Sequence, residues 1–260
     1  WTNESAYEDV DALFVDINGD GYQDLYVVSG GNEYPPNDLN YMDRIYINDG
    51  KGNFSKGSII NTSPFSGSVV KASDYDNDGD MDLFVGARHV PHQYPLPASS
   101  ILLINQNGTL INRTQTLASE FENIGMVTDA IWNDYDADGD PDLTLVGEWM
   151  PITFFNNQNG ALKKTEMVGL EDSSGWWFSL EKGDFDGDGD MDFIAGNLGL
   201  NYKYKTSKET PFDIYYKDFD NNGKNDIVLG YYNNNKHYPL RGFSCSSEQI
   251  PVLKDEIGEY

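Results

Sequence analysis

Short apolar segments recur along the chain, each bounded by turn-forming residues. In five places one such segment leads into an acidic loop and a second follows it, as ALFV (12–15) and LYVV (25–28) do around the first loop. Runs rich in Val, Ile and aromatic residues between turn signals are typical of β-strands. The pattern predicts five antiparallel strand pairs, with first strands at 12–15, 68–72, 129–132, 177–181 and 213–216 and second strands at 25–28, 83–85, 143–146, 193–195 and 227–229.

Further apolar segments follow the first three strand pairs and are separated by Asp-Gly or Asn-Gly turns. Such turns between apolar runs are strong hairpin signals. They predict hairpins at 44–48 with 54–59, 100–105 with 109–114, and 152–157 with 161–166. Four strands in each long repeat are typical of a β-propeller blade. The sequence therefore predicts an all-β fold, a β-propeller of about five four-stranded blades, in which the fourth blade is abbreviated because the fifth loop follows it closely.

One domain is predicted over residues 1–260, because the repeats account for most of the chain. A Ser near its end reads as the cap of a helix that starts within 246–260. The repeat cores are expected near 10–60, 68–115, 127–167, 176–205 and 211–245.

The five acidic loops align without gaps as DINGDGYQD, DYDNDGDMD, DYDADGDPD, DFDGDGDMD and DFDNNGKND. Positions 1 and 9 are always Asp, position 6 is always Gly, and positions 3 and 5 are Asp or Asn. Oxygens at alternate positions of a tight turn can converge on one point, and Ca²⁺ takes about 6–8 oxygen ligands. Position 6 needs Gly because a sharp turn requires a positive φ, and position 7 can offer its backbone carbonyl.

The predicted calcium ligands, for up to five Ca²⁺ ions, are therefore Asp16, Asn18, Asp20, Tyr22 and Asp24; Asp74, Asp76, Asp78, Asp80 and Asp82; Asp134, Asp136, Asp138, Asp140 and Asp142; Asp184, Asp186, Asp188, Asp190 and Asp192; and Asp218, Asp220, Asn222, Lys224 and Asp226. Metal-free turns also favour Asp, Asn and Gly, but five loops in register favour the metal. An EF-hand is excluded, because it needs a Glu at position 12 and every loop has an apolar residue there. The second, third and fourth loops hold most carboxylates and are expected to bind best.

The overall composition limits which partners and settings are possible for this chain. The chain has 43 Asp and Glu against 17 Lys and Arg, a formal net charge of −26. Such a protein repels nucleic acid and anionic membranes, and no apolar run is long enough for insertion into a membrane. A single cysteine excludes an internal disulfide. The chain opens WTNESAYEDV, without a signal segment, so we expect a processed product or a piece of a longer protein.

The segments that follow the second strand of each pair are expected to gather at the propeller end opposite the acidic loops. Loops on a rigid scaffold often carry binding residues. The candidates are Arg88, His89, His92, Glu148, Trp149, Trp176, Trp177, Asn197, Asn201, Tyr231, Tyr232 and His237. Aromatic rings beside amide and charged groups suit a sugar or a peptide. The alternative is that the tryptophans only fill the space between blades.

The chain resembles the FG-GAP/VCBS repeat family of calcium-binding β-propellers, and more narrowly the bacterial surface proteins related to cartilage acidic protein, the ASPIC/UnbV group. The stretches that carry the resemblance include DLYVVSGGNEYPP (24–36), RIYINDGKGNF (44–54) and GWWFSLEKGDFDGDGDMDFIAGNLGLN (175–201). The resemblance implies an extracellular, calcium-stabilised module of a larger surface protein. It also implies seven blades, of which some lie outside this chain, although closure with five is an alternative.

The expected function is a non-enzymatic binding or adhesion module for a glycan or a surface protein. One alternative is a calcium-assisted polysaccharide lyase or hydrolase that uses His89, His92, His237, Arg88 and Glu148. The other is a purely structural spacer. Weak calcium sites stay empty at cytosolic calcium levels, so the expected location is extracellular, at the cell surface or in the periplasm.

Overall fold

The computed structural model describes residues 4–57, 60 and 62–256. The chain divides into two compact units, residues 1–197 and residues 198–260. Each unit is described by itself below. None of the helices in the described ranges is long and apolar enough to cross a membrane.

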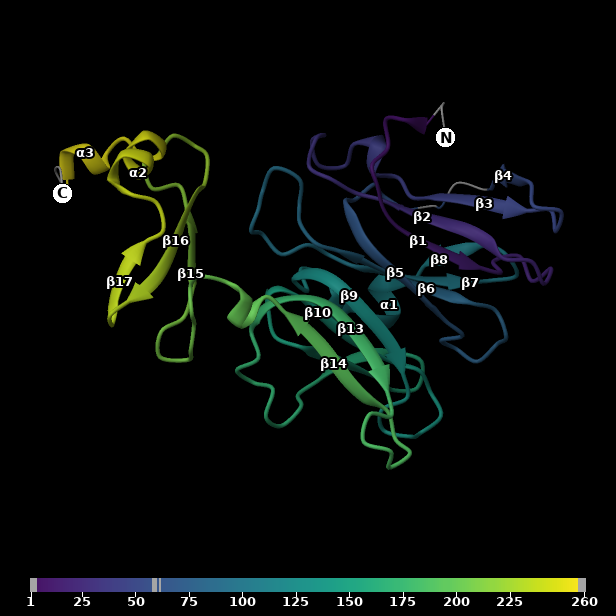
Figure 1. Ribbon diagram of the computed structural model, residues 1–260. Coiled ribbons are helices and arrows are strands. Elements are labelled where there is room, and N and C mark those ends of the chain that lie inside the picture. The colour runs from purple at the N-terminus through teal and green to yellow at the C-terminus, as the bar shows by residue number, and fades with distance from the viewer. Residues whose placement is uncertain (1–3, 58–59, 61, 257–260) are drawn as a thin grey trace. The chain divides into compact units, whose positions relative to one another are not determined.

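The first unit consists of antiparallel sheets that follow one another along the chain (Figure 1). The first two sheets are four-stranded meanders, in which each strand pairs with the next. Their strands are β1 (Asp9–Val15), β2 (Asp24–Ser29), β3 (Arg44–Asn48) and β4 (Phe54–Lys56), then β5 (Gly67–Ser73), β6 (Asp82–Ala87), β7 (Ile101–Asn105) and β8 (Leu110–Asn112). The short helical turns η2 (Leu39–Tyr41), α1 (Thr114–Leu117) and η3 (Ser119–Phe121) lie in the connections.

The third and fourth repeats share one six-stranded sheet, because β13 pairs with β10 through Trp176 and Glu148. The third repeat has four strands, whereas the described part of the fourth repeat has two. The strands are β9 (Met126–Asn133), β10 (Asp142–Met150), β11 (Thr153–Asn157) and β12 (Leu162–Thr165), then β13 (Gly175–Gly183) and β14 (Asp192–Asn197).

The second unit contains the fifth repeat, a three-stranded antiparallel sheet followed by two short helices. Its elements are η4 (Gly199–Asn201), β15 (Asp213–Lys217), β16 (Asp226–Asn233), β17 (Lys236–Pro239), α2 (Phe243–Gln249) and α3 (Leu253–Glu256).

The predicted all-β architecture is confirmed, and the described residues form all five strand pairs and all three hairpins. Residues 58 and 59 of the first predicted hairpin lie outside the described ranges. Some boundaries were wrong. The strand predicted to run to residue 114 ends at Asn112, before α1, and the helix expected to start at Ser246 begins at Phe243. The backbone N–H of Ser246 already donates to the carbonyl of Gly242 at 3.0 Å, so Ser246 lies inside the helix.

Apolar cores form where one sheet packs against the next. Val15, Tyr26 and Val28 of the first sheet cluster with Val70 and Leu83 of the second. A larger core, which includes Phe84, Phe121, Trp132 and Phe155, joins the second sheet to the third. Each fully buried side chain of this kind stabilises the fold by about 1.5–3 kcal/mol. The sheets therefore stack face to face.

Two aspartates join neighbouring repeats at equivalent places, five residues before an acidic loop. Asp11 accepts the backbone N–H of Ala12 at 2.8 Å and, through its other oxygen, that of Val70 in the next sheet at 2.9 Å. Asp129 accepts the N–H groups of Ala130 and of Leu180 in the same way, both at 2.8 Å. These bridges fix the first strand of one repeat beside that of the next.

A buried carboxyl in the first sheet makes the stability of this unit depend on pH. Asp43 accepts hydrogen bonds from the hydroxyl of Tyr26 and the backbone N–H of Ser29, both at 2.8 Å. Burial nevertheless raises the pKa of Asp43 from 3.8 to about 7. Between about pH 4 and 7 the folded state therefore holds a proton that the unfolded chain has released, so the contribution of Asp43 to the free energy of unfolding falls as pH rises.

An Asp43→Asn variant is expected to lack this dependence, because the amide stays neutral. We expect the difference in unfolding free energy, wild type minus variant, to fall between about pH 4 and 7 and then to level off. Chemical denaturation at each pH measures it. Two parallel pH profiles would contradict the assignment.

Candidate functional site

Each acidic loop connects the first two strands of a repeat, and its glycine at position 6 has the predicted backbone conformation. The φ values are +85° at Gly21, +96° at Gly79 and Gly139, +99° at Gly189 and +86° at Gly223. A Cβ at these positions would meet nothing within 4 Å. The glycine is therefore required by φ and not by space.

The first aspartate of each loop folds the turn around itself. Asp134 accepts the backbone N–H of Asp138 at 3.0 Å and that of Gly139 at 2.9 Å. Asp74 and Asp184 accept the N–H of Gly79 and Gly189 in the same way, at 3.1 and 3.2 Å. At position 7 the backbone N–H donates to the side chain at position 5, which leaves the carbonyl of position 7 as a possible ligand.

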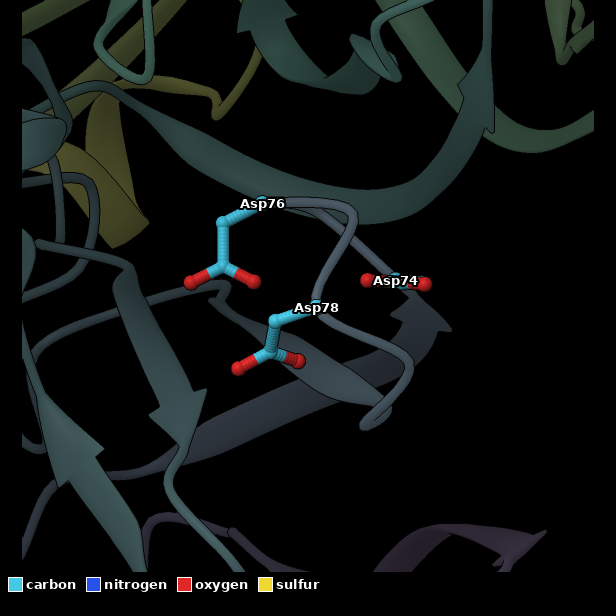
Figure 2. A group of neighbouring side chains, drawn as sticks. All are labelled: Asp74, Asp76 and Asp78. Atoms are coloured by element: carbon cyan, nitrogen blue, oxygen red, sulfur yellow. The ribbon is translucent and has the colours of Figure 1, made fainter.

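Four of the five loops bring three carboxylates together, with one oxygen from each lying within 4.8 Å of the others. Figure 2 shows one group projecting from a single turn of the chain. Two unit charges 4 Å apart repel by roughly 4 kcal/mol at the effective dielectric of a protein surface, so a cation would remove a substantial cost. The groups are Asp74, Asp76 and Asp78; Asp134, Asp136 and Asp142; Asp184, Asp186 and Asp192; and Asp218, Asp220 and Asp226.

The second loop fits a hard cation best. One carboxylate oxygen of Asp74, Oδ1, is buried and has no hydrogen-bond partner among the described residues. Burial, followed by the negative charge of Asp78, raises the pKa of Asp76. Burial also raises the pKa of Asp82 to about 6. An all-oxygen donor set with an unsatisfied buried acceptor is what a divalent cation such as Ca²⁺ or Mg²⁺ would complete.

The first loop differs, because Asn18 stands where the other loops have Asp. Its side-chain amide donates to Asp20 at 3.0 Å, and the described residues include no three-carboxylate group in this loop. We therefore expect the first loop to hold a cation less tightly than the others.

At the other ends of the strands, side chains from the second and third repeats form a continuous polar chain. The guanidinium of Arg88 contacts the carboxylate of Glu148 through Nε at 3.0 Å and Nη2 at 2.5 Å. The hydroxyl of Tyr94 lies 3.5 Å from the other oxygen of Glu148 and accepts the indole N–H of Trp149 at 2.8 Å. The side chain of Glu148 is only 6% exposed, whereas that of Arg88 is 45% exposed.

The three tryptophans of this region have different environments. The rings of Trp149 and Trp176 meet edge to face, with centroids 5.1 Å apart, and both are half-buried. Trp149 also has a φ of +60°, which is strained for a bulky residue. Trp177 instead packs against the core of the third and fourth repeats and donates to the carbonyl of Ser173 at 2.8 Å. Trp177 therefore helps to fill the space between the third and fourth repeats.

The remaining candidates divide between the two units. His89 contacts the carbonyl of Gly31 through Nε2 at 3.1 Å, and burial lowers its pKa. The backbone N–H of His92 donates to Asn32, and Asn197 pairs with Trp177 across β13 and β14. The structure thus gathers loops of the first four repeats. The candidates in the second unit are Asn201, Tyr231, Tyr232 and His237, of which His237 pairs with Asp213 at 2.9 Å.

Comparison with known proteins identifies the repeats. A family model described as FG-GAP-like repeat matches residues 16–85 and 134–195, just over half of the chain. The chain belongs to the FG-GAP-like repeat family. No curated protein matches it. Among solved structures, the chain is similar to a lectin of Agrocybe aegerita described as recognising non-reducing terminal N-acetylglucosamine, with 15% identity and a TM-score of 0.49 over 93% of this chain and 69% of that one.

In the FG-GAP-like repeats, position 9 has a second role that the spacing of the loop does not predict. Its buried aspartate ties the loop to the end of the third strand. Asp82 accepts the backbone N–H of Tyr75 at 2.9 Å and that of Asn105 at 2.7 Å. Asp24 and Asp142 do the same in the first and third repeats.

The asparagine at the end of the third strand completes this arrangement. The side-chain amide of Asn105 donates at 2.8 Å to the carbonyl of Ile17, in the acidic loop of the preceding repeat, and that of Asn157 donates at 3.3 Å to the carbonyl of Tyr75. The signal in the sequence is an Asn that recurs at 48, 105 and 157, just before each hairpin turn.

Proposed function

We propose that this chain is an extracellular calcium-binding β-propeller module that binds a glycan or a surface protein without catalysing a reaction. The observation that carries the proposal is the recurrence of three clustered carboxylates at the same place in successive repeats. Within the family, the proposal includes the closer relationship to bacterial surface proteins of the ASPIC/UnbV group. It also includes further blades in the parent protein.

Calcium is the cation proposed for the loops, because the ligands are hard oxygens supplied by a flexible turn. Up to five ions would bind, with the side chains of positions 1, 3, 5 and 9 and the carbonyl of position 7 as ligands. The buried Oδ1 of Asp74 supports this ligand set. Calcium sites of extracellular modules have dissociation constants of about 10⁻⁴–10⁻³ M, which supports a location outside the cytosol.

The polar chain at the other strand ends supports binding more than catalysis. Glu148 is held as an ion pair by Arg88, and His89 is occupied by a backbone carbonyl. A general acid or base needs a group that is free to exchange a proton with the substrate. These residues are instead arranged as a rigid polar surface beside aromatic rings.

A lyase assay and a calcium count test the proposal together. Acidic polysaccharides incubated with the protein and calcium are expected to give no rise in the ultraviolet absorbance of unsaturated uronides. Equilibrium dialysis is expected to show several calcium ions bound per chain. An absorbance rise that Glu148→Gln abolishes would establish the enzyme instead. If equilibrium dialysis finds no bound calcium, the calcium-binding part of the proposal is refuted.

A further inference from the structure

We propose that the polar chain from Trp149 through Tyr94 and Glu148 to Arg88 is the recognition site for a neutral carbohydrate. This inference rests on the proposed binding function and specifies its ligand. Its starting point is a buried carboxylate joined to a half-exposed guanidinium at the end of a strand, beside two half-buried indole rings.

The geometry of the chain fixes each group before a ligand arrives. Glu148 lies on β10, and its backbone pairs with that of Trp176 on β13, so the position of the residue is fixed by two strands. That carboxylate holds the guanidinium of Arg88 through Nε and Nη2. A guanidinium has more N–H donors than these two contacts use, and the side chain of Arg88 is 45% exposed. Donors therefore remain available to a ligand at a preset position.

The aromatic side of the site is equally constrained. Trp149 holds a left-handed backbone conformation with a φ of +60°. Its indole N–H is hydrogen-bonded to Tyr94 at 2.8 Å, and its ring packs against Trp176. Strained residues that persist against their conformational cost are concentrated at binding sites. A half-buried pair of indoles beside hydrogen-bond donors suits the apolar C–H face of a pyranose whose hydroxyls meet the polar groups.

Charge decides between a neutral and an anionic ligand. The positive charge of Arg88 is neutralised by the buried Glu148 at 2.5 Å. The carboxylates of Glu8 and Glu33 both lie against Gly31, whose carbonyl His89 contacts. The formal charge of the whole chain is −26. Because Arg88 is already paired with Glu148, an anionic sugar would enter a negative field, so the site favours a neutral one.

The inference is tested by measuring saccharide binding to the full chain in saturating calcium, with tryptophan fluorescence as the readout. The probes are a panel of neutral methyl glycosides and disaccharides, with galacturonic and sialic acids as anionic comparators. We expect saturable binding of at least one neutral probe and weaker binding of the anionic ones. Arg88→Lys keeps a charge for Glu148 but loses the planar fork, and it should weaken binding about tenfold or more.

Arg113→Lys is the matched control, because Arg113 is an exposed arginine after β8; it should bind as the wild type does. Trp176→Ala should lose binding as well. Neutral probes that fail to bind, anionic probes that bind more tightly, an Arg88→Lys variant that binds normally, or binding only to displayed peptides would each overturn the inference. Thermal melts of the same samples with and without calcium separate the two failures: lost sugar binding with intact calcium stabilisation refutes only the carbohydrate site.

Discussion

Replacing Asp142 by alanine is expected to lower the free energy of unfolding by about 3–5 kcal/mol in chelator, and by more in calcium because a proposed ligand is lost as well. Asp142 is fully buried and accepts the backbone N–H of Asn157 at 2.7 Å and that of Tyr135 at 3.2 Å. Alanine would leave both donors without an acceptor, and each unsatisfied buried donor costs about 1–3 kcal/mol. The third strand of the repeat would lose its attachment to the acidic loop.

Asp138→Ala is the matched control in the same loop. Asp138 is exposed and accepts only the backbone N–H of Asp140 in the described structure, at 2.9 Å. In chelator its loss should change the unfolding free energy by no more than about 0.5 kcal/mol, whereas in calcium it should remove part of the stabilisation. Urea denaturation in both conditions measures the two effects. Equal losses for both variants in chelator would show that position 9 has no structural role beyond the metal.

The strands and the acidic loops could be predicted because their signals are local. A turn that needs a positive φ must have Gly, and Gly21, Gly79 and Gly139 stand where the repeat requires them. The double role of position 9 could not be predicted, because its partners lie on the third strand, as Asn105 does for Asp82. Nothing in one repeat alone indicates which backbone donor a buried carboxylate will meet.

The site at the other strand ends could be predicted in position but not in detail. The topology brought Arg88 and Glu148 to the same end, although 60 residues separate them. That Glu148 is buried beneath Arg88, and that Trp177 belongs to the core, depends on how the sheets pack. Trp176 and Trp177 are adjacent in the chain and have opposite surroundings, because neighbouring residues of a strand face opposite sides.

Calcium is expected to raise the melting temperature of the first unit by about 8–16 °C over that in chelator. A site of the proposed affinity that is saturated about tenfold stabilises the folded state by about 1.4 kcal/mol. The three carboxylate groups of the first unit would together contribute roughly 4 kcal/mol, and for a unit of this size 1 kcal/mol shifts the melting temperature by about 2–4 °C. Relief of repulsion within each group acts in the same direction.

Differential scanning calorimetry in chelator, in about 10 mM CaCl₂ and in MgCl₂ of equal concentration separates this effect from screening. The control is necessary because a chain of charge −26 gains stability from any salt. Asp186 belongs to the carboxylate group of the fourth loop and is exposed. Asp186→Asn should therefore remove the part of the calcium-induced rise in melting temperature that this loop contributes, and leave the melting temperature in chelator unchanged. Three of the four groups lie in the first unit, so its transition should move most. Identical melts in chelator and in calcium would mean that the loops are metal-free turns, with the aspartates acting only as acceptors for the backbone.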